Sequence, residues 1–201
     1  MDAAVHEAGH AVARWWCGVP LRLVAALPDG TGITAAAERP IVSVTDASNA
    51  DEFHRLATVA YAGAVSEAMV TGVNVDVLWR GVAVYDAAKV SVAAYRLFLL
   101  DDVTIAKQAA MRTAILIFKQ PLVLTMAMAV AGLIVKRRAV RGVTVLNLLD
   151  DTIGQRYPRR HRERLLFTRH TGAARRHERE GREHPGALCE RRGERDGRRR
   201  S

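Results

Sequence analysis

The sequence predicts an α+β fold that is mainly α, with a small N-terminal β-sheet and a disordered C-terminal tail. The chain is 49% hydrophobic but only 5% aromatic, and its many alanines and valines favour helices with small, closely packed interfaces. Pro, Asp and Gly interrupt the segment that follows the first helix, which indicates short strands and turns. The 201 residues suit one domain, residues 1–155, and an appendage, residues 156–201.

The predicted elements begin with a helix over residues 3–17, which Asp2 caps and Gly18-Val19-Pro20 ends. LRLVAAL (21–27) then predicts a strand, PDGTG a turn, and ITAAAERPIVSV (33–44) one or two short strands. The remaining predicted elements are helices over residues 51–70 (capped by Ser48 or Asn49), 84–99, 104–119, 121–138 and 144–149.

One uncharged segment, LVLTMAMAVAGLIV (122–135), raises the question of a membrane helix. It is too short, because a span needs about 20 apolar residues, and we expect a buried core helix. The N-terminus lacks the basic stretch and long apolar core of a signal peptide, so we expect a cytoplasmic protein. Cys17 and Cys189 lie in unrelated regions and form no disulfide framework, which fits a reducing compartment.

The excess positive charge of the chain belongs to its C-terminal part. Residues 156–201 contain 16 Arg and 7 acidic residues, whereas residues 1–155 contain 14 basic and 14 acidic ones. Such a segment has too few apolar residues to offset the entropy lost on ordering, and we expect it to be disordered. Its arginines can attract nucleic acid or acidic surfaces. The alternative is a solvated extension without a role, since no aromatic residues are interleaved to stack on bases.

The first predicted helix carries the sequence HEAGH, which is typical of a metal-binding helix. Positions i and i+4 lie on one face of a helix, so His6 and His10 can direct two imidazole nitrogens at one ion. Glu7 is displaced around the helix but can take a proton from a water molecule that the ion activates. The alternative is a surface helix with two unrelated histidines, but the HExxH pattern arises by chance in only about one shuffled chain in a hundred.

A catalytic zinc site of this kind needs a third protein ligand. The residues alone leave that ligand open. For Glu67, a supporting role such as holding a histidine N–H is about as well indicated as no role at all. The candidates are Asp46, Asp51, His54, Asp76, Asp86 and, for a site with two histidines and a glutamate, Glu67.

The sequence HEAGHA, residues 6–11, resembles the motif of the FtsH-type AAA+ zinc metalloproteases. The peptidase domain of that family is mainly helical and binds zinc through the two histidines of HEAGH and a distant aspartate. The resemblance covers residues 2–151 and is strongest at HEAGHA. It continues in TGIT (31–34), YAGAVSEAMVTG (61–72), VYDAAKVSVAAYRL (84–97) and VLTMAMAVAGLIVKRRAVRGVTVLNLLD (123–150).

The resemblance implies a third ligand and a division of roles. Asp86 begins a predicted helix at the place of the family's aspartate ligand. The implied centre therefore holds one Zn²⁺ per chain on His6, His10 and Asp86, and Glu7 is the general base.

The sequence also departs from that family, which joins its peptidase to an ATPase and to membrane helices. No GxxxxGK[ST] loop occurs among the 201 residues. We therefore expect a zinc metalloendopeptidase that hydrolyses peptides or unfolded proteins without ATP, or that works with a separate unfoldase. The alternative is an inactive or weakly active peptidase-like binding or regulatory module whose tail contacts nucleic acid or acidic partners. The oligomeric state stays open, and a homo-oligomer is one option.

Overall fold

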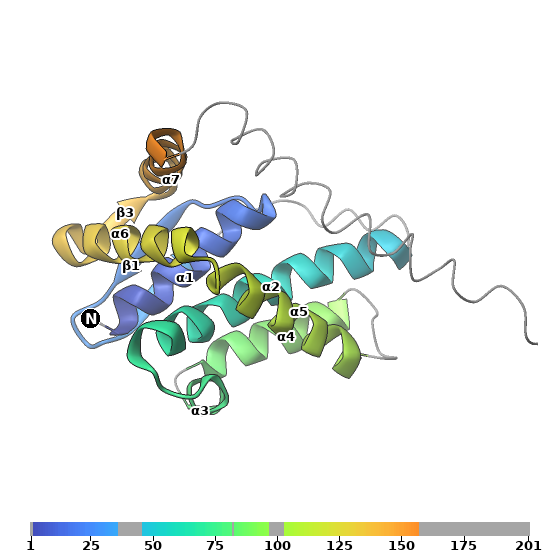
Figure 1. The fold of residues 1–201 in the computed structure, drawn as a ribbon. Helices are drawn as coiled ribbons and strands as arrows, with labels where there is room; N and C mark the ends of the chain where they lie inside the picture. Colours follow the sequence, from blue (N-terminus) through green and yellow to red (C-terminus); the bar gives the residue numbers. More distant parts are fainter. Residues whose placement is uncertain (1, 36–45, 82, 97–102, 157–201) are drawn as a thin grey trace, which may run out of the picture.

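The computed structural model describes residues 2–35, 46–81, 83–96 and 103–156. In these ranges the protein is mainly helical with one small antiparallel sheet, as the sequence predicts (Figure 1). The predicted disordered tail lies outside the described residues, apart from Arg156 at the end of the last helix. The elements are α1 (Asp2–Cys17), β1 (Leu23–Ala26), β2 (Gly32–Ala35), α2 (Asp46–Thr71), α3 (Val75–Arg80), α4 (Val84–Arg96), α5 (Val103–Phe118), α6 (Pro121–Arg137), β3 (Ala139–Arg141) and α7 (Gly142–Arg156).

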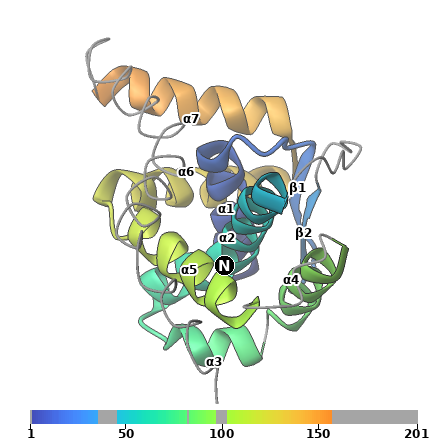
Figure 2. The same ribbon diagram turned by 90° about the vertical axis from the view of Figure 1, so that its right-hand side faces the viewer.

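Helix α1 forms the centre of the fold. Every residue from Ala4 to Ala13 is buried, because α2 packs along one side of α1 and α6 along another. Figure 2 shows α1 and α2 in the middle of the molecule, with α4 and α5 on either side. The helices come close at Gly9, where a Cβ atom would lie 2.5 Å from the carbonyl oxygen of Ala62. The small residues that favour close helix packing thus bury a helix that carries two histidines and a glutamate.

The sheet has the strand order β2-β1-β3, and both pairs are antiparallel. The predicted strand over residues 21–27 corresponds to β1. Of the predicted strand region over residues 33–44, β2 covers the first part, and residues 36–45 lie outside the described ranges. The sheet is not wholly N-terminal, because β3 comes from the far end of the domain and pairs Val140 with Val24. Three residues are too few for a periodic pattern, which explains why the sequence did not predict β3.

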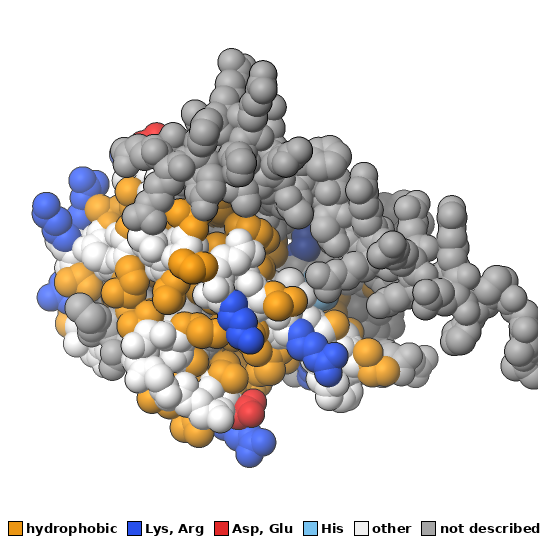
Figure 3. Space-filling model, viewed as in Figure 1, with side chains coloured by type: hydrophobic (Ala, Val, Ile, Leu, Met, Phe, Trp, Pro, Cys, Tyr) orange, Lys and Arg blue, Asp and Glu red, His pale blue; other side chains and the backbone are white. Residues whose placement is uncertain are grey.

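Helix α6 confirms that the uncharged segment 122–135 is a core helix. One of its faces is buried, including Met126, Val130 and Ile134, and the helix packs against α1. None of the described helices is by itself long and apolar enough to cross a membrane. Helices α5 and α6 taken together reach the necessary length and apolar composition, but there is a bend of 86° between them. On the face shown in Figure 3, hydrophobic side chains are spread over much of the described surface, with a few basic side chains among them.

The helix boundaries differ from the predicted ones in four places. Helix α1 begins at Asp2, so the predicted cap residue lies inside the helix. Helix α2 begins at Asp46, so Ser48 and Asn49 lie inside it and do not cap it. Helix α3 was not predicted, and the side chain of Asn74 caps it by accepting a hydrogen bond from the Asp76 amide. Helix α7 is much longer than the predicted helix over residues 144–149.

Candidate metal centre

Helix α1 places His6 and His10 one turn apart on a buried face. Their ring centroids are 4.8 Å apart, and the rings meet edge to face. Both side chains face α2 at Gly63, where a Cβ atom would lie 2.5 Å from Nε2 of His6 and 2.6 Å from Nε2 of His10. A glycine at this position of α2 is therefore what leaves room for the two imidazoles.

The third member of the cluster comes from the first turn of α4. One carboxylate oxygen of Asp86, Oδ2, lies 3.1 Å from Nε2 of His6 and 3.1 Å from Nε2 of His10. All three side chains are buried, and one ligand atom from each lies within 4.8 Å of the others. The chain thus brings together residues that are 76 to 80 positions apart.

The far nitrogen of each imidazole has its own hydrogen-bond acceptor. Nδ1 of His10 lies 2.7 Å from the carbonyl oxygen of Val59, and Nδ1 of His6 lies 3.0 Å from Oε2 of Glu67. A carbonyl oxygen only accepts, so Nδ1 of His10 carries a proton. Nε2 donates to Asp86 only when it is protonated as well, and in the neutral ring it keeps a lone pair for a metal ion. An ionised Glu67 fixes the ring of His6 in the same way. Both Nε2 atoms are therefore oriented as metal-binding histidines usually are.

The cluster suits a divalent metal ion in spacing and in donor type. Two ligand atoms on one tetrahedral zinc lie about 3.4 Å apart, because each bond is about 2.1 Å long. The two separations of 3.1 Å at Asp86 are close to that spacing. Imidazole nitrogen and carboxylate oxygen are both common zinc ligands, and other divalent ions accept the same set. The residues therefore fit a metal ion without identifying which one.

The electrostatics of the cluster come from burial and from the contacts among its members. Burial lowers the pKa of His6, but the hydrogen bonds to Asp86 and Glu67 outweigh it and raise that pKa to about 9. Burial raises the pKa of Asp86, yet hydrogen bonds from His10, His6 and Lys89 hold it well below its usual value. Asp86 is thus a carboxylate at neutral pH, which is the form that binds cations.

Glu7 lies on the same helix and contacts strand β2. Its Oε2 accepts a hydrogen bond from the Thr34 hydroxyl, and its side chain is buried. Gly32 gives it room, since a Cβ atom there would lie 2.6 Å from Oε1 of Glu7. The segment TGIT therefore both covers and orients the carboxylate.

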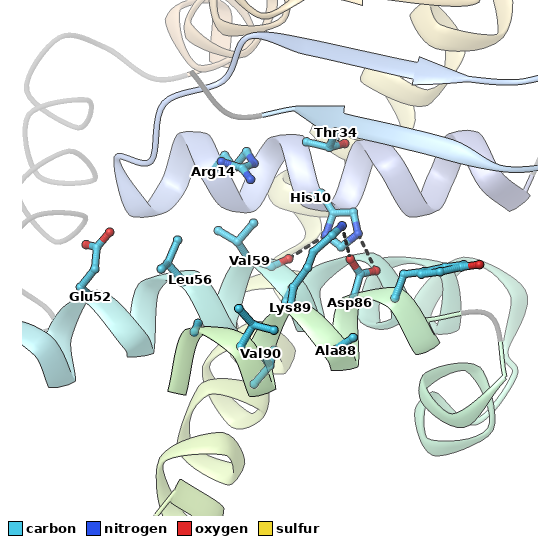
Figure 4. A pocket seen from close by; sticks show the side chains of 14 residues that line it. His10, Arg14, Thr34, Glu52, Leu56, Val59, Asp86, Ala88, Lys89 and Val90 are labelled. Atoms are coloured by element: carbon cyan, nitrogen blue, oxygen red, sulfur yellow. Dashed lines mark hydrogen bonds and ion pairs between the residues drawn. The ribbon is translucent and has the colours of Figure 1, made fainter. Parts of the chain in front are cut away.

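A cavity of about 490 Å³ adjoins the cluster (Figure 4). His10 and Asp86 form part of its wall, and the close-up shows the Asp86 carboxylate between His10 and Lys89. The ammonium group of Lys89 lies 2.8 Å from Oδ1 of Asp86, the oxygen that does not face the histidines. The cluster is thus buried and yet borders a space that can receive a ligand.

The other candidates for a third ligand lie elsewhere. Asp51 and Asp76 are exposed, and Nε2 of His54 lies 3.1 Å from the Thr113 hydroxyl. The side chain of Asp46 lies outside the described part of the chain. Sequence reasoning did not identify Gly63, Val59, Thr34 or Lys89 as parts of the site. Thr34, Gly63 and Lys89 do lie in segments that resemble the FtsH-type family, but the resemblance assigns them no role. The small-residue run around Gly63 also indicates close packing, without saying against what.

Comparison with known proteins adds no family assignment. No protein-family model matches the chain, and no curated protein sequence matches it significantly. The resemblance of HEAGHA and the segments after it to the FtsH-type peptidases therefore stays a prediction.

Proposed function

We propose that this protein is a zinc-dependent metallopeptidase of the HExxH type, similar to the peptidase domain of the FtsH-type family. His6, His10 and Asp86 hold the ion, and Glu7 is the general base. The observation that carries the proposal is the convergence of two Nε2 atoms and one carboxylate oxygen beside a cavity, with both far nitrogens held by acceptors. A helix with two unrelated histidines needs none of these contacts.

The reaction divides between the ion and the protein. When bound, a divalent ion would polarise a scissile carbonyl and lower the pKa of a water molecule. Glu7 accepts the proton of the attacking water and passes it to the leaving amine, which is general base and then general acid catalysis. Thr34 holds the Glu7 carboxylate, and its hydroxyl limits how far that carboxylate turns.

The substrates that suit such a site are peptides and unfolded protein chains. A peptide bond reaches a buried cluster only as an extended or flexible segment, and the cavity is large enough for one or two side chains. Folded proteins would need an unfoldase, and no GxxxxGK[ST] loop occurs among these 201 residues.

The experiment that tests the proposal measures metal content and hydrolysis on the same samples. Elemental analysis of the purified protein should find close to one zinc per chain, and the protein should cleave casein or a labelled peptide. Asp86→Ala should lose both, because it removes the carboxylate that contacts both histidines. Asp76→Ala changes an exposed aspartate on α3 and should keep both. Wild-type protein that contains no stoichiometric metal and gains no activity from added zinc would refute the proposal.

A further inference from the structure

We infer that Arg14 binds a substrate carboxylate in the cavity beside the candidate metal centre, so that the peptidase prefers a carboxylate close to the bond it cleaves. The carboxylate comes either from the C-terminus of the peptide or from an Asp or Glu side chain. The inference rests on the proposed function, since it assigns a substrate class to the same site.

Arg14 lies one helical turn beyond His10 on α1, and both residues line the cavity (Figure 4). Four helical residues span about 6 Å, and one residue of an extended peptide spans about 3.5 Å. A carboxylate at Arg14 would therefore lie about one to three residues from a carbonyl group at the metal centre. That distance makes Arg14 a residue for substrate recognition at positions close to the cleaved bond, and a C-terminal carboxylate can lie only on the leaving-group side of that bond.

The guanidinium group of Arg14 is largely unpaired. One of its nitrogens, Nη1, donates to the carbonyl oxygen of Pro20 at 3.1 Å. Its Nε is buried and has no acceptor among the residues that the structure describes, and no carboxylate in those ranges forms an ion pair with it. A guanidinium has five N–H donors and stays charged at neutral pH, so most of its hydrogen-bonding capacity is available to a ligand.

The electrostatic surroundings favour an anionic ligand at Arg14. Burial lowers its pKa, against the opposing effect of the Asp86 and Glu7 charges, which shows that the guanidinium is partly removed from water. The Asp86 and Glu7 charges act on Arg14 without contacting it. A half-buried charge without a contacting counterion is costly, and a ligand carboxylate would offset part of that cost. The other cation at the cavity, Lys89, already pairs with Asp86. Arg14 is therefore the cavity cation that lacks an anionic partner within the described ranges.

The rest of the cavity is mostly apolar, which limits what can accompany the carboxylate. A hydrophobic side chain fits such walls. Besides Asp86, one described lining residue is a carboxylate, Glu52, and it pairs with Arg55. A peptide that carries both an apolar side chain and a carboxylate matches the cavity best. The apolar lining includes Leu56, Val59, Ala60, Val90, Val92 and Ala93.

Matched peptides test the inference with wild-type protein alone. Two pairs of apolar peptides are compared. The first pair has the same sequence and ends in either a free carboxylate or an amide. Both peptides of the second pair end in an amide, and one carries an internal Glu where the other carries Gln. We expect kcat/KM to be about 10- to 100-fold higher for a carboxylate peptide than for its neutral counterpart, as a charge-assisted hydrogen bond provides. A preference in the first pair identifies the peptide C-terminus as the source of the carboxylate, and a preference in the second pair identifies an acidic side chain. Equal kcat/KM in both pairs would overturn the inference while leaving a peptidase in place.

Variants assign the preference to Arg14. Arg14→Met should abolish the ratio between the acid and amide peptides, and Arg14→Lys should retain part of it. Arg112→Met removes an exposed arginine from α5 and should keep the wild-type ratio. An unchanged ratio in Arg14→Met would overturn the assignment.

A binding measurement separates the inference from the proposed function. If wild-type protein cleaves none of the peptides, the proposed function fails, and calorimetry with 3-phenylpropionate and 3-phenylpropionamide still tests Arg14. Binding of the acid at least 10-fold tighter than the amide in wild type, but not in Arg14→Met, would support a carboxylate site. Equal binding of acid and amide by wild type, or the same preference in Arg14→Met, would refute it.

Discussion

The two histidines of the metal centre differ in the acceptor that holds the far nitrogen. His10 donates to a backbone carbonyl of α2, which no side-chain substitution removes, whereas His6 donates to Glu67. The orientation of His6 is therefore the more easily disturbed. An acidic partner also makes the imidazole a stronger metal ligand.

Replacing Glu67 tests that supporting contact. Glu67→Ala should weaken zinc affinity by about 10- to 100-fold, because His6 loses the acceptor that fixes its ring. Glu67→Gln should weaken it less, since an amide oxygen still accepts. Competition with a chromophoric chelator measures the affinity, and Asp51→Ala, an exposed acid on the same helix, serves as control. Wild-type affinity in Glu67→Ala would show that the contact does not support the site.

The residues of the site were predictable from the sequence to different degrees. The period of a helix brings His6 and His10 together, so HEAGH alone predicts that part. Asp86 is 76 residues further along, and the residues alone left it among several alternatives. Arg14 carries no local signal, because an arginine in the last turn of a helix is common and only the fold places it in a cavity.

At the level of elements, the site depends on how closely α1 and α2 approach. Gly9 of α1 faces α2, and Gly63 of α2 faces the imidazoles. Serine contributes as well, since the Ser66 hydroxyl lies 3.0 Å from the carbonyl oxygen of Val5. The small side chains of this interface set the position of the histidines relative to α4.

Adding one methyl group at Gly63 tests the role of this interface. Gly63→Ala should lower the free energy of unfolding by about 1–3 kcal/mol and weaken metal binding, because the new Cβ would overlap the imidazoles. Gly132→Ala in α6 is the matched control, since nothing lies within 4 Å of a Cβ there. It should raise the free energy of unfolding by up to about 1 kcal/mol. Denaturant titration measures both, and a neutral Gly63→Ala would contradict the packing described.

The elements that were not predicted from the sequence are short, which explains why they were not predicted. Strand β3 and helix α3 have only three and six residues, so neither shows a clear hydrophobic period. Strand β3 depends on its pairing with β1, a contact between residues more than 100 positions apart. The long helices were predicted because their patterns are local, whereas the sheet is completed by a non-local contact.

At the scale of the whole molecule, the cluster of His6, His10 and Asp86 joins two separate parts of the chain. His6 and His10 belong to the buried central helix, and Asp86 belongs to α4, which packs on α2. A bound ion would therefore stabilise the arrangement of α1, α2 and α4 together. In the described structure, hydrogen bonds from Asp86 to both histidines connect α4 to α1.

Metal removal should lower the stability of the fold. Free zinc at 100 times its dissociation constant adds about 2.7 kcal/mol to the free energy of unfolding. We expect a chelator to lower the Tm of wild-type protein and added zinc to restore it. Asp86→Ala should show no zinc-dependent change in Tm, and a wild-type Tm that responds to neither chelator nor zinc would contradict a structural link through the ion.

Removing the arginine-rich C-terminal segment tests the alternative function, a binding module that contacts nucleic acid or acidic partners. A chain shortened to residues 1–156 should keep its metal content and peptidase activity, because the described elements are all retained. If the segment binds nucleic acid, the full chain should retain DNA or RNA at low salt and release it steeply as salt rises, and the shortened chain should not bind. Absence of binding at low salt would remove the nucleic-acid interpretation.

The central claim is that Glu7 acts as the general base of a metal-dependent peptidase. The most direct measurement is the rate of peptide cleavage by Glu7→Gln at full metal occupancy, compared with wild type. Because the amide cannot accept the proton, the rate should fall by about 10²- to 10⁴-fold while zinc content stays near one per chain. Equal rates for Glu7→Gln and wild type at equal zinc content would contradict the claim.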